Sequence, residues 1–217
     1  MKEYHKIQSI FKRDEKTFKF LLGQYALPEF EYLKNNKWVW TEKIDGTNIR
    51  VIWECPPKDS MKTNLGHVEF KGKTDNAQTP EFLLAKLQEI FTVDKMMKIF
   101  PETNVGLYGE GYGAKIQKGG GNYISNGVDF ILIDILIDNW WLKRDNIEDI
   151  AQKLEIKAVP IVGSGTLEEA VEFTRKGYNS TFGNFLAEGI VLKSEIELKM
   201  RNGDRVITKM KYKDFLI

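Results

Sequence analysis

Residues 38–53 read WVWTEKIDGTNIRVIW and decide the architecture of the chain. Two β-rich runs, residues 38–40 and 49–53, flank the turn-like stretch from Asp45 to Asn48. Aromatic and β-branched residues favour strands, whereas an Asp-Gly pair favours a tight turn. The stretch therefore predicts two strands around a loop, with Lys43 at the edge of that loop.

The rest of the chain alternates strand-like and helical segments without a repeat or a low-complexity linker. Capping-box spacing at residues 145–148 and 166–169 predicts two helix starts, and Asn202-Gly203 predicts a hairpin turn. We expect an α+β fold with largely antiparallel sheets flanked by helices, in a single domain over residues 1–217. The expected strands are 68–71, 105–108, 130–137, 189–193, 198–200 and 205–210, and the expected helices are 80–100, 145–154 and 166–175.

Composition limits the chemistry that the chain can perform. Hydrophobic residues make up 42% and charged residues 29%, which is typical of a soluble globular protein and excludes a disordered or membrane-spanning one. Cys55 is the single cysteine, so an intrachain disulfide and a cysteine-based zinc site are excluded. With two histidines in the chain, lysine and the acidic residues must carry any catalysis. The polar start, residues 1–13, does not resemble a signal peptide, and we expect a cytoplasmic protein.

Five short clusters are candidates for a functional site. Lys43 beside the Gly46 turn can act as a nucleophile, although Lys-x-Asp-Gly also occurs as an ordinary solvated turn. Glu110 stands among glycines that would let a ligand approach the backbone, and Phe130 begins an apolar strand and could stack on a purine. Taken singly, Glu110 also fits an exposed turn residue, and Phe130 also fits a core residue.

The last two clusters lie towards the C-terminus. Glu188 precedes a buried strand, where a lone glutamate is usually a structural cap or a surface charge. Lys209 and Lys211 are two residues apart in a predicted strand, so both side chains point to the same side. Two ammonium groups on one face repel each other unless an anion lies between them, and the pair fits a phosphate-binding face as well as a solvated one.

The five clusters, in this order, resemble the motifs of the covalent nucleotidyltransferase superfamily of DNA ligases, RNA ligases and mRNA capping enzymes. Residues 43–48, KIDGTN, and residues 110–118 are most similar to the RNA ligase 2 family of phage and related enzymes. The similarity extends from Lys37 to the C-terminus. The resemblance implies the ATP-grasp-like adenylation fold of a nucleotidyltransferase and a role in RNA repair.

The resemblance also implies a mechanism. The neutral amine of Lys43 would attack the α-phosphorus of ATP, expel pyrophosphate and form lysyl-AMP. AMP would then pass to a 5′-phosphate, and a 3′-hydroxyl would displace it to seal the strand. A free lysine has a pKa of about 10.4 and is mostly protonated, so cations are needed nearby. Lys209, Lys211 and Mg²⁺, or Mn²⁺ in its place, would supply them.

Further roles follow from the same resemblance. Glu110 and Glu188 would hold the metal directly or through its waters, and Glu110 could also bind the ribose hydroxyls. Phe130 would stack on adenine, and Glu42 with the nearby backbone, including Ile44, would read its exocyclic amine. Asn48 would lie near the transferred phosphate. Lys73 occupies the place of the usual arginine at the 5′-phosphate, and this departure predicts weaker or more permissive end binding. Ile133 is a second departure, since an aromatic residue often precedes the aspartate.

The expected partners are RNA ends, either nicked or single-stranded. Ends that contain DNA are included in this expectation. The chain ends six residues after Lys211, so we expect a catalytic domain without a C-terminal OB-fold or helical domain. A monomer is expected, with an accessory protein as a possible replacement for that domain. Four basic side chains are candidate RNA contacts, although solvated surface positions explain them equally well: Lys115, Lys118, Arg144 and Arg201.

Other functions stay open. A minimal DNA ligase would differ in the sugar it requires at the 3′ end, and GTP-dependent capping is less favoured because the best match is to ATP-using relatives. A nucleotide-responsive binding module, or a catalytic subunit that needs a partner, would adenylylate Lys43 and join nothing. A Walker-type ATPase is excluded, because residues 119–121 lack the following Lys and Ser/Thr of a P-loop.

Overall fold

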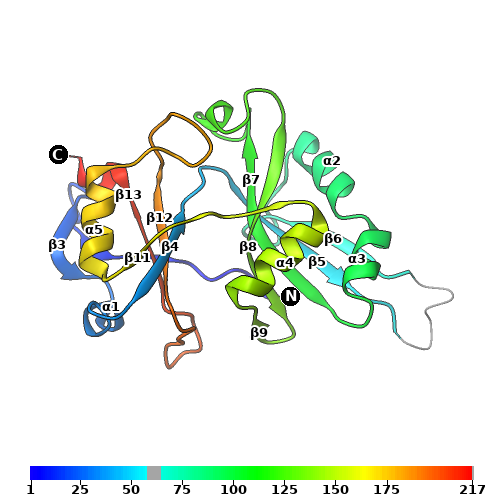
Figure 1. Ribbon diagram of the computed structural model, residues 1–217, viewed down its shortest axis with the longest axis horizontal. Coiled ribbons are helices and arrows are strands. Elements are labelled where there is room, and N and C mark those ends of the chain that lie inside the picture. The colour runs from blue at the N-terminus through cyan, green and yellow to red at the C-terminus, as the bar shows by residue number, and fades with distance from the viewer. Residues whose placement is uncertain (58–64, 217) are drawn as a thin grey trace. The chain divides into compact units, whose positions relative to one another are not determined.

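The computed structural model describes residues 1–57 and 65–216, and the chain forms two units, each built on its own sheet (Figure 1). Unit 1 contains residues 1–4 and 45–159, and unit 2 contains residues 5–44 and the chain from Pro160 onward. The chain passes from unit 2 to unit 1 between Ile44 and Asp45, directly after the predicted nucleophile Lys43. The single domain expected over residues 1–217 stays a prediction.

The sheet of unit 1 has the strand order β10-β8-β7-β5-β6, and β9 pairs with β8 outside this path. The pairs are antiparallel except for β10 with β8, which are parallel. The strands are β5 (Thr47–Glu54), β6 (His67–Lys71), β7 (Val105–Gly113), β8 (Val128–Ile137), β9 (Trp140–Trp141) and β10 (Lys157–Ala158).

Helices cover one face of this sheet and form the core of unit 1 with it. The helices are α2 (Glu81–Ile90), α3 (Val93–Ile99) and α4 (Arg144–Leu154), with a short η2 turn at Gly120–Asn122. Burial of apolar side chains is the main force that holds the two layers together. The core includes Leu83 and Leu87 of α2, Ile147 and Leu154 of α4, and the strand residues Val51, Trp53, Leu107, Phe130 and Leu132.

The single helix expected over residues 80–100 is wrong, because the structure has two helices there. Helix α2 ends at Ile90, and α3 begins at Val93. The side chain of Thr92 accepts a hydrogen bond from the backbone N–H of Lys95, so Thr92 is an N-cap in the middle of the expected helix. The apolar spacing continues through the break, which is why the sequence pattern alone did not reveal it.

The main sheet of unit 2 has the strand order β1-β13-β12-β4-β11, and all pairs are antiparallel except β1 with β13. A separate two-stranded hairpin consists of β2 and β3. The strands are β1 (Gln8–Ser9), β2 (Phe11–Arg13), β3 (Phe20–Tyr25), β4 (Trp38–Glu42), β11 (Ile161–Gly165), β12 (Gly189–Ser194) and β13 (Ile207–Lys211), and the helices are α1 (Pro28–Tyr32), α5 (Leu167–Lys176) and the short η3 (Tyr212–Phe215).

Two local sequence signals in unit 2 are confirmed, and a third, in unit 1, is wrong. Thr166 and Glu169 form a reciprocal capping box at the start of α5. The turn at Asn202-Gly203 is present, but its flanks form an isolated bridge between Lys199 and Arg205 instead of a long hairpin. The capping box expected at residues 145–148 does not form, because α4 begins earlier, at Arg144, without a side-chain cap. The α+β class with mostly antiparallel sheets is confirmed.

Candidate active site

Lys43 lies immediately after β4, which is an inner strand of the unit 2 sheet. The backbone N–H of Lys43 donates to the carbonyl of Gly189 at 2.8 Å, which continues the ladder between β4 and β12 by one residue. Ile44 follows with 4% of its surface exposed. The backbone on both sides of the lysine is therefore held, and the side chain begins from a fixed position.

The side chains of Lys43, Glu188 and Lys211 meet in a group that we call the lysine–glutamate cluster. The Nζ of Lys43 lies 2.7 Å from one carboxylate oxygen of Glu188, and the Nζ of Lys211 lies 2.5 Å from the other. The side chains are 19%, 14% and 28% exposed in the order Lys43, Glu188, Lys211. Two ammonium groups share one carboxylate, so the cluster carries a net positive charge and attracts an anion.

Strand register explains why Glu188 reaches Lys211. Gly189 pairs with Lys211 across β12 and β13, so the residue before Gly189 lies beside the end of β13. A Cβ at position 189 would lie 2.2 Å from the carbonyl oxygen of Met210, so only glycine permits this approach. Lys209 is on β13 two residues before Lys211, opposite Val191, and the strand period places both lysine side chains on the same side.

Glu42 has a different role from the one expected. Its side chain is 1% exposed, and its carboxylate accepts hydrogen bonds from the Ser180 hydroxyl at 2.5 Å and from the Thr181 N–H and hydroxyl at 2.9 and 2.7 Å. Both oxygens are committed to the loop between α5 and β12. The structure therefore gives no support to the prediction that the Glu42 side chain reads a purine amine.

Within unit 1, Asn48 and Glu110 are brought together. They are directly opposite each other on β5 and β7, and the Asn48 side-chain amide donates to the Glu110 carboxylate at 2.6 Å. A Cβ at position 46 would lie 2.4 Å from the carbonyl oxygen of Gly111 and 2.6 Å from Cγ of Glu110. The glycine of the Lys-x-Asp-Gly motif is therefore needed for the close packing of the loop on β7.

Phe130 does not present a stacking surface. Its side chain is 0% exposed and packs edge-on against Phe91, with ring centroids 5.2 Å apart. Its neighbour Ile131 is opposite Glu110, and side chains alternate along a strand, so Phe130 points to the face opposite Glu110. The structure therefore gives no support to the prediction that Phe130 stacks on adenine, because the ring is packed in the core of unit 1.

Lys73 is exposed beyond the end of β6, in a segment that a buried arginine supports. Arg50, 2% exposed, donates to the carbonyl of Gly72 at 3.3 Å and to the carboxylate of Asp75 at 2.5 Å. The hydrogen bond from Arg50 lowers the pKa of the Asp75 carboxyl. Sequence reasoning missed Arg50, although a lone cation inside the apolar run 49–53 was a usable signal.

Arg50 also borders a buried polar group on the sheet. It is opposite Tyr108, which is in turn opposite Asp134, and the Tyr4 hydroxyl donates to the Asp134 carboxylate. Burial raises the pKa of Tyr108 to about 12, with a smaller opposing effect from Arg50. Burial also raises the pKa of Tyr112. Both phenols are therefore neutral hydrogen-bonding groups at physiological pH.

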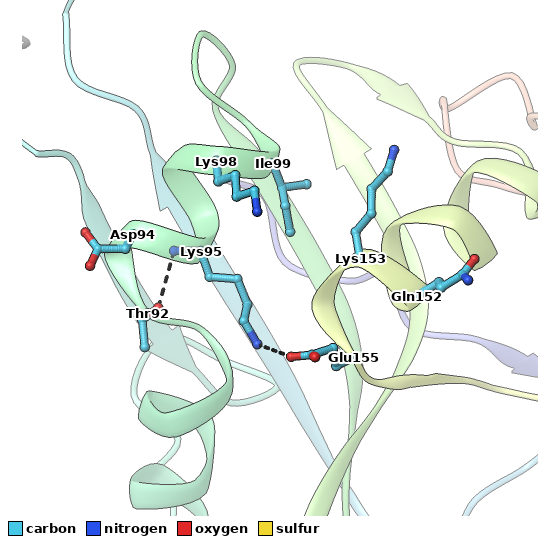
Figure 2. Close-up of a pocket in the computed structure, with 8 residues that line it drawn as sticks. All are labelled: Thr92, Asp94, Lys95, Lys98, Ile99, Gln152, Lys153 and Glu155. Atoms are coloured by element: carbon cyan, nitrogen blue, oxygen red, sulfur yellow. Dashed lines mark hydrogen bonds and ion pairs between the residues drawn. The ribbon is translucent and has the colours of Figure 1, made fainter.

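A separate groove lies between α3 and α4 of unit 1 (Figure 2). Figure 2 shows Lys95 reaching across it to Glu155, an ion pair of 3.0 Å. The groove contains none of the predicted site residues. Its lining consists of Thr92, Asp94, Lys95, Lys98, Ile99, Gln152, Lys153 and Glu155.

The other basic residues proposed as RNA contacts are on the surface. Lys115, Lys118 and Arg201 are exposed. Arg144 forms an ion pair of 2.6 Å with Glu148 one helical turn along α4, which is an ordinary arrangement on a solvated helix face. None of the four is singled out by its surroundings.

Among residues 1–57 and 65–216, no three His, Cys, Asp or Glu side chains are grouped closely enough to hold a metal ion by themselves. Glu110 and Glu188 each provide one carboxylate, in units 1 and 2 respectively. Mg²⁺ usually takes one or two carboxylates, keeps several waters and binds substrate phosphates. A single carboxylate of this kind fits a metal ion that arrives with a triphosphate and keeps most of its waters. Of the described helices, none has the length and apolar character needed to cross a membrane.

Comparison with solved structures identifies the fold. A form of Naegleria gruberi RNA ligase with ATP and Mn matches at a TM-score of 0.67 and 19% identity, over 98% of this chain and 56% of that one. The same ligase with PPi matches at a TM-score of 0.66 and 20% identity, again over 98% and 56%. This chain thus spans 56% of the length of each of these two matched chains.

Comparison with protein families gives the assignment. A family model described as RNA ligase matches residues 36–211. The match contains the lysine–glutamate cluster of unit 2 and the Asn48–Glu110 pair of unit 1. Because it extends over most of the sequence, this chain belongs to the RNA ligase family.

Proposed function

We propose that this chain is an ATP-dependent RNA ligase that forms lysyl-AMP at Lys43. The neutral Nζ attacks the α-phosphorus of ATP. The N–P bond forms as the bond to the pyrophosphate oxygen breaks, and the nitrogen loses a proton. An oxygen of the 5′-phosphate of an RNA then attacks the phosphorus of AMP, the N–P bond breaks, and the lysine nitrogen regains a proton. A 3′-hydroxyl attacks that phosphate, and AMP leaves as the phosphodiester forms.

The observation that carries this proposal is the lysine–glutamate cluster. Glu188 forms an ion pair with Lys43 at 2.7 Å and another with Lys211 at 2.5 Å. The nucleophile candidate therefore has a second cation close by, bound to the same carboxylate. Negative charge on the phosphoryl oxygens is the main obstacle to attack, and preorganised cations oppose it. Lys209, on the same side of β13, adds a third ammonium group to this face.

Unit 1 would contribute polar groups for the nucleotide and the RNA end. The Asn48–Glu110 pair supplies an amide for a phosphate oxygen and a carboxylate for a ribose hydroxyl or a metal-bound water. Lys73, on the segment supported by Arg50, would contact the 5′-phosphate. No residue is assigned to stacking on adenine, because Phe130 is buried.

Divalent metal belongs to the same proposal. Glu110 and Glu188 would hold Mg²⁺ or Mn²⁺, partly through water. The matched Naegleria gruberi RNA ligase structures are with ATP and Mn and with AMP and Mn, which supports ATP and a divalent metal as cofactors here as well. The metal would neutralise charge on the phosphates, a contribution that adds to the lysines of this chain.

The direct test is covalent labelling with ATP that carries 32P at the α-phosphate, in the presence of Mg²⁺. The wild-type chain should retain one label per molecule through denaturing electrophoresis, and Lys43→Ala should retain none. Lys37→Ala is the matched control, because Lys37 forms an exposed ion pair with Glu195 in the same unit. An unlabelled wild-type chain, or a Lys43→Ala chain that still labels, would reject the proposal.

The substrate is settled by a panel of ends. RNA and DNA 3′-hydroxyl strands, nicked or single-stranded, separate an RNA ligase from a minimal DNA ligase, and GTP in place of ATP tests the capping alternative. We expect joining with RNA 3′ ends and with ATP. We take the protein to be a cytoplasmic monomer, with or without an accessory protein.

A second candidate is a catalytic subunit that needs a partner. If Lys43 is labelled but no nicked, hairpin or tRNA-like RNA is ever joined, this second function replaces the first.

A further inference from the structure

An aromatic side chain stands in an unfavourable position on the β2–β3 hairpin. Phe18, on the turn between the two strands, has a φ of 58° and a side chain that is 70% exposed. Left-handed backbone is uncommon for bulky residues, and an exposed ring gains little from burial. Neither feature helps the hairpin to fold, and outliers of this kind often occur at functional sites.

The turn holds Phe18 in this conformation by hydrogen bonds. One carboxylate oxygen of Asp14 accepts from the N–H of Lys16 at 3.1 Å and from the N–H and hydroxyl of Thr17 at 2.7 and 2.9 Å. The Phe18 N–H donates to the Asp14 carbonyl at 2.9 Å. The bonds from Thr17 lower the pKa of the Asp14 carboxyl. The ring is thus presented by an ordered turn.

Three unpaired lysines belong to the same hairpin as the exposed ring. The side chains of Lys12, Lys16 and Lys19 are exposed and form no ion pair with another residue in the described part of the chain. The acidic residues of the turn are Asp14, which is engaged in it, and Glu15. The hairpin therefore offers an aromatic face with excess positive charge. This combination binds single-stranded nucleic acid, where bases stack on rings and phosphates approach cations.

The hairpin is fastened to the strand that carries the catalytic lysine candidates. Arg13 lies 3.0 Å from the Asp214 carboxylate, which also accepts from the backbone N–H of Lys211 at 3.1 Å. The rings of Phe20 and Phe215 pack edge to face at 5.4 Å. In Figure 1, β3 is blue and the segment after β13 is red, both in unit 2. A strand of RNA held at the hairpin would be fixed relative to Lys211.

We infer that the β2–β3 hairpin is an RNA-binding element, in which Phe18 stacks on a base and Lys12, Lys16 and Lys19 contact phosphates. This inference rests on the proposed function, because it assigns the polynucleotide that the site joins. Lysine is depleted in the cores of protein–protein interfaces, so three unpaired lysines in the same hairpin as the ring favour RNA over a protein partner.

The test compares Phe18→Gly with Phe18→Trp in the full chain. Fluorescence anisotropy with a labelled, 5′-phosphorylated single-stranded RNA measures Kd. Phe18→Gly should weaken binding about tenfold, as loss of one base–aromatic stack does. Glycine suits a φ of 58°, so the Tm should not fall. Phe18→Trp should retain wild-type affinity. Covalent labelling by ATP should be unchanged in both variants.

Lysine substitutions test the phosphate contacts. Lys16→Ala and Lys19→Ala should each reduce the salt dependence of log Kd by about 0.7 on a single strand. Lys153→Ala, in the groove of Figure 2, is the matched control and should leave Kd unchanged. Wild-type affinity in Phe18→Gly, or an equal loss in Lys153→Ala, would overturn the inference. Absence of ATP labelling would instead reject the proposed function, while the anisotropy comparison still reports on the hairpin.

Discussion

At the scale of single residues, neighbours decide what a motif residue can do. Lys43 and Phe130 both match motifs of the family, yet one side chain lies in a charged cluster and the other in the apolar core. Glu42 precedes the nucleophile candidate and is fully occupied by Ser180 and Thr181. Motif matching gave the identity of these residues, whereas the direction of each side chain came from strand register.

Phe130→Leu distinguishes a core residue from a stacking residue. The ring is 0% exposed and contacts Phe91, so the substitution should lower the free energy of unfolding by about 1–2 kcal/mol. The KM for ATP in the labelling reaction should stay within about twofold of wild type. Urea denaturation gives the first quantity. An unchanged stability with a tenfold higher KM would restore Phe130 to the nucleotide site.

The same residues show how far sequence carries. Lys43, Glu188 and the two C-terminal lysines were predicted from motif order, and the structure brings Lys43, Glu188 and Lys211 together. Arg50 and the Phe18 turn were missed, because neither belongs to a motif of the family. A buried cation inside a strand and an aromatic residue with positive φ depend on partners that are distant in sequence or on backbone geometry.

At the scale of elements, local chemistry predicted some boundaries well. Thr166 and Glu169 carry their capping information within four residues, and the box forms as expected. The break at Thr92 was hidden, because Thr92 lies within an apolar periodicity that spans both helices. The Asn202-Gly203 turn forms, while the extent of its strands depends on β12 and β1, which pair with β13 instead.

Thr166→Ala tests the cap of α5. The Thr166 hydroxyl accepts from the Glu169 N–H at 3.3 Å, and the Thr166 N–H donates to the Glu169 carboxylate at 2.7 Å. Loss of the cap should cost about 1 kcal/mol of unfolding free energy. Thr181→Ala is unsuitable as a control because Thr181 binds Glu42, so Thr103→Ala, in the connection before β7 of unit 1, is used.

The cap also predicts a pH dependence. The hydrogen bonds from Thr166 lower the pKa of Glu169 below its value in the unfolded chain. A lowered carboxyl pKa stabilises the fold above the unfolded pKa, and this stability is lost as the pH falls through the folded pKa. The difference in stability between wild type and Glu169→Ala, which removes the carboxylate that both Thr166 bonds reach, should therefore shrink on acidification below about pH 4. A constant difference down to pH 2 would contradict the cap.

At the scale of the whole molecule, two sheets have two separate cores. Leu87 is completely buried in the core of unit 1 and Leu192 in that of unit 2. Leu87→Ala and Leu192→Ala should each destabilise the protein by about 2–5 kcal/mol. Hydrogen exchange read by mass spectrometry should accelerate mainly in the unit that carries the substitution, since amides exchange through local opening. Equal acceleration in both units would show that they open together.

The strand order of unit 2 has a consequence for synthesis on the ribosome. Strand β13 lies between β1 and β12, so the sheet cannot be completed until residues 207–211 have left the exit tunnel. The unit 1 sheet has its last strand by Ala158 and can form while the remainder is still being translated. Until β13 inserts, Lys43 and Glu188 lack their neighbour Lys211, so the lysine–glutamate cluster is completed only at the end of translation of this segment.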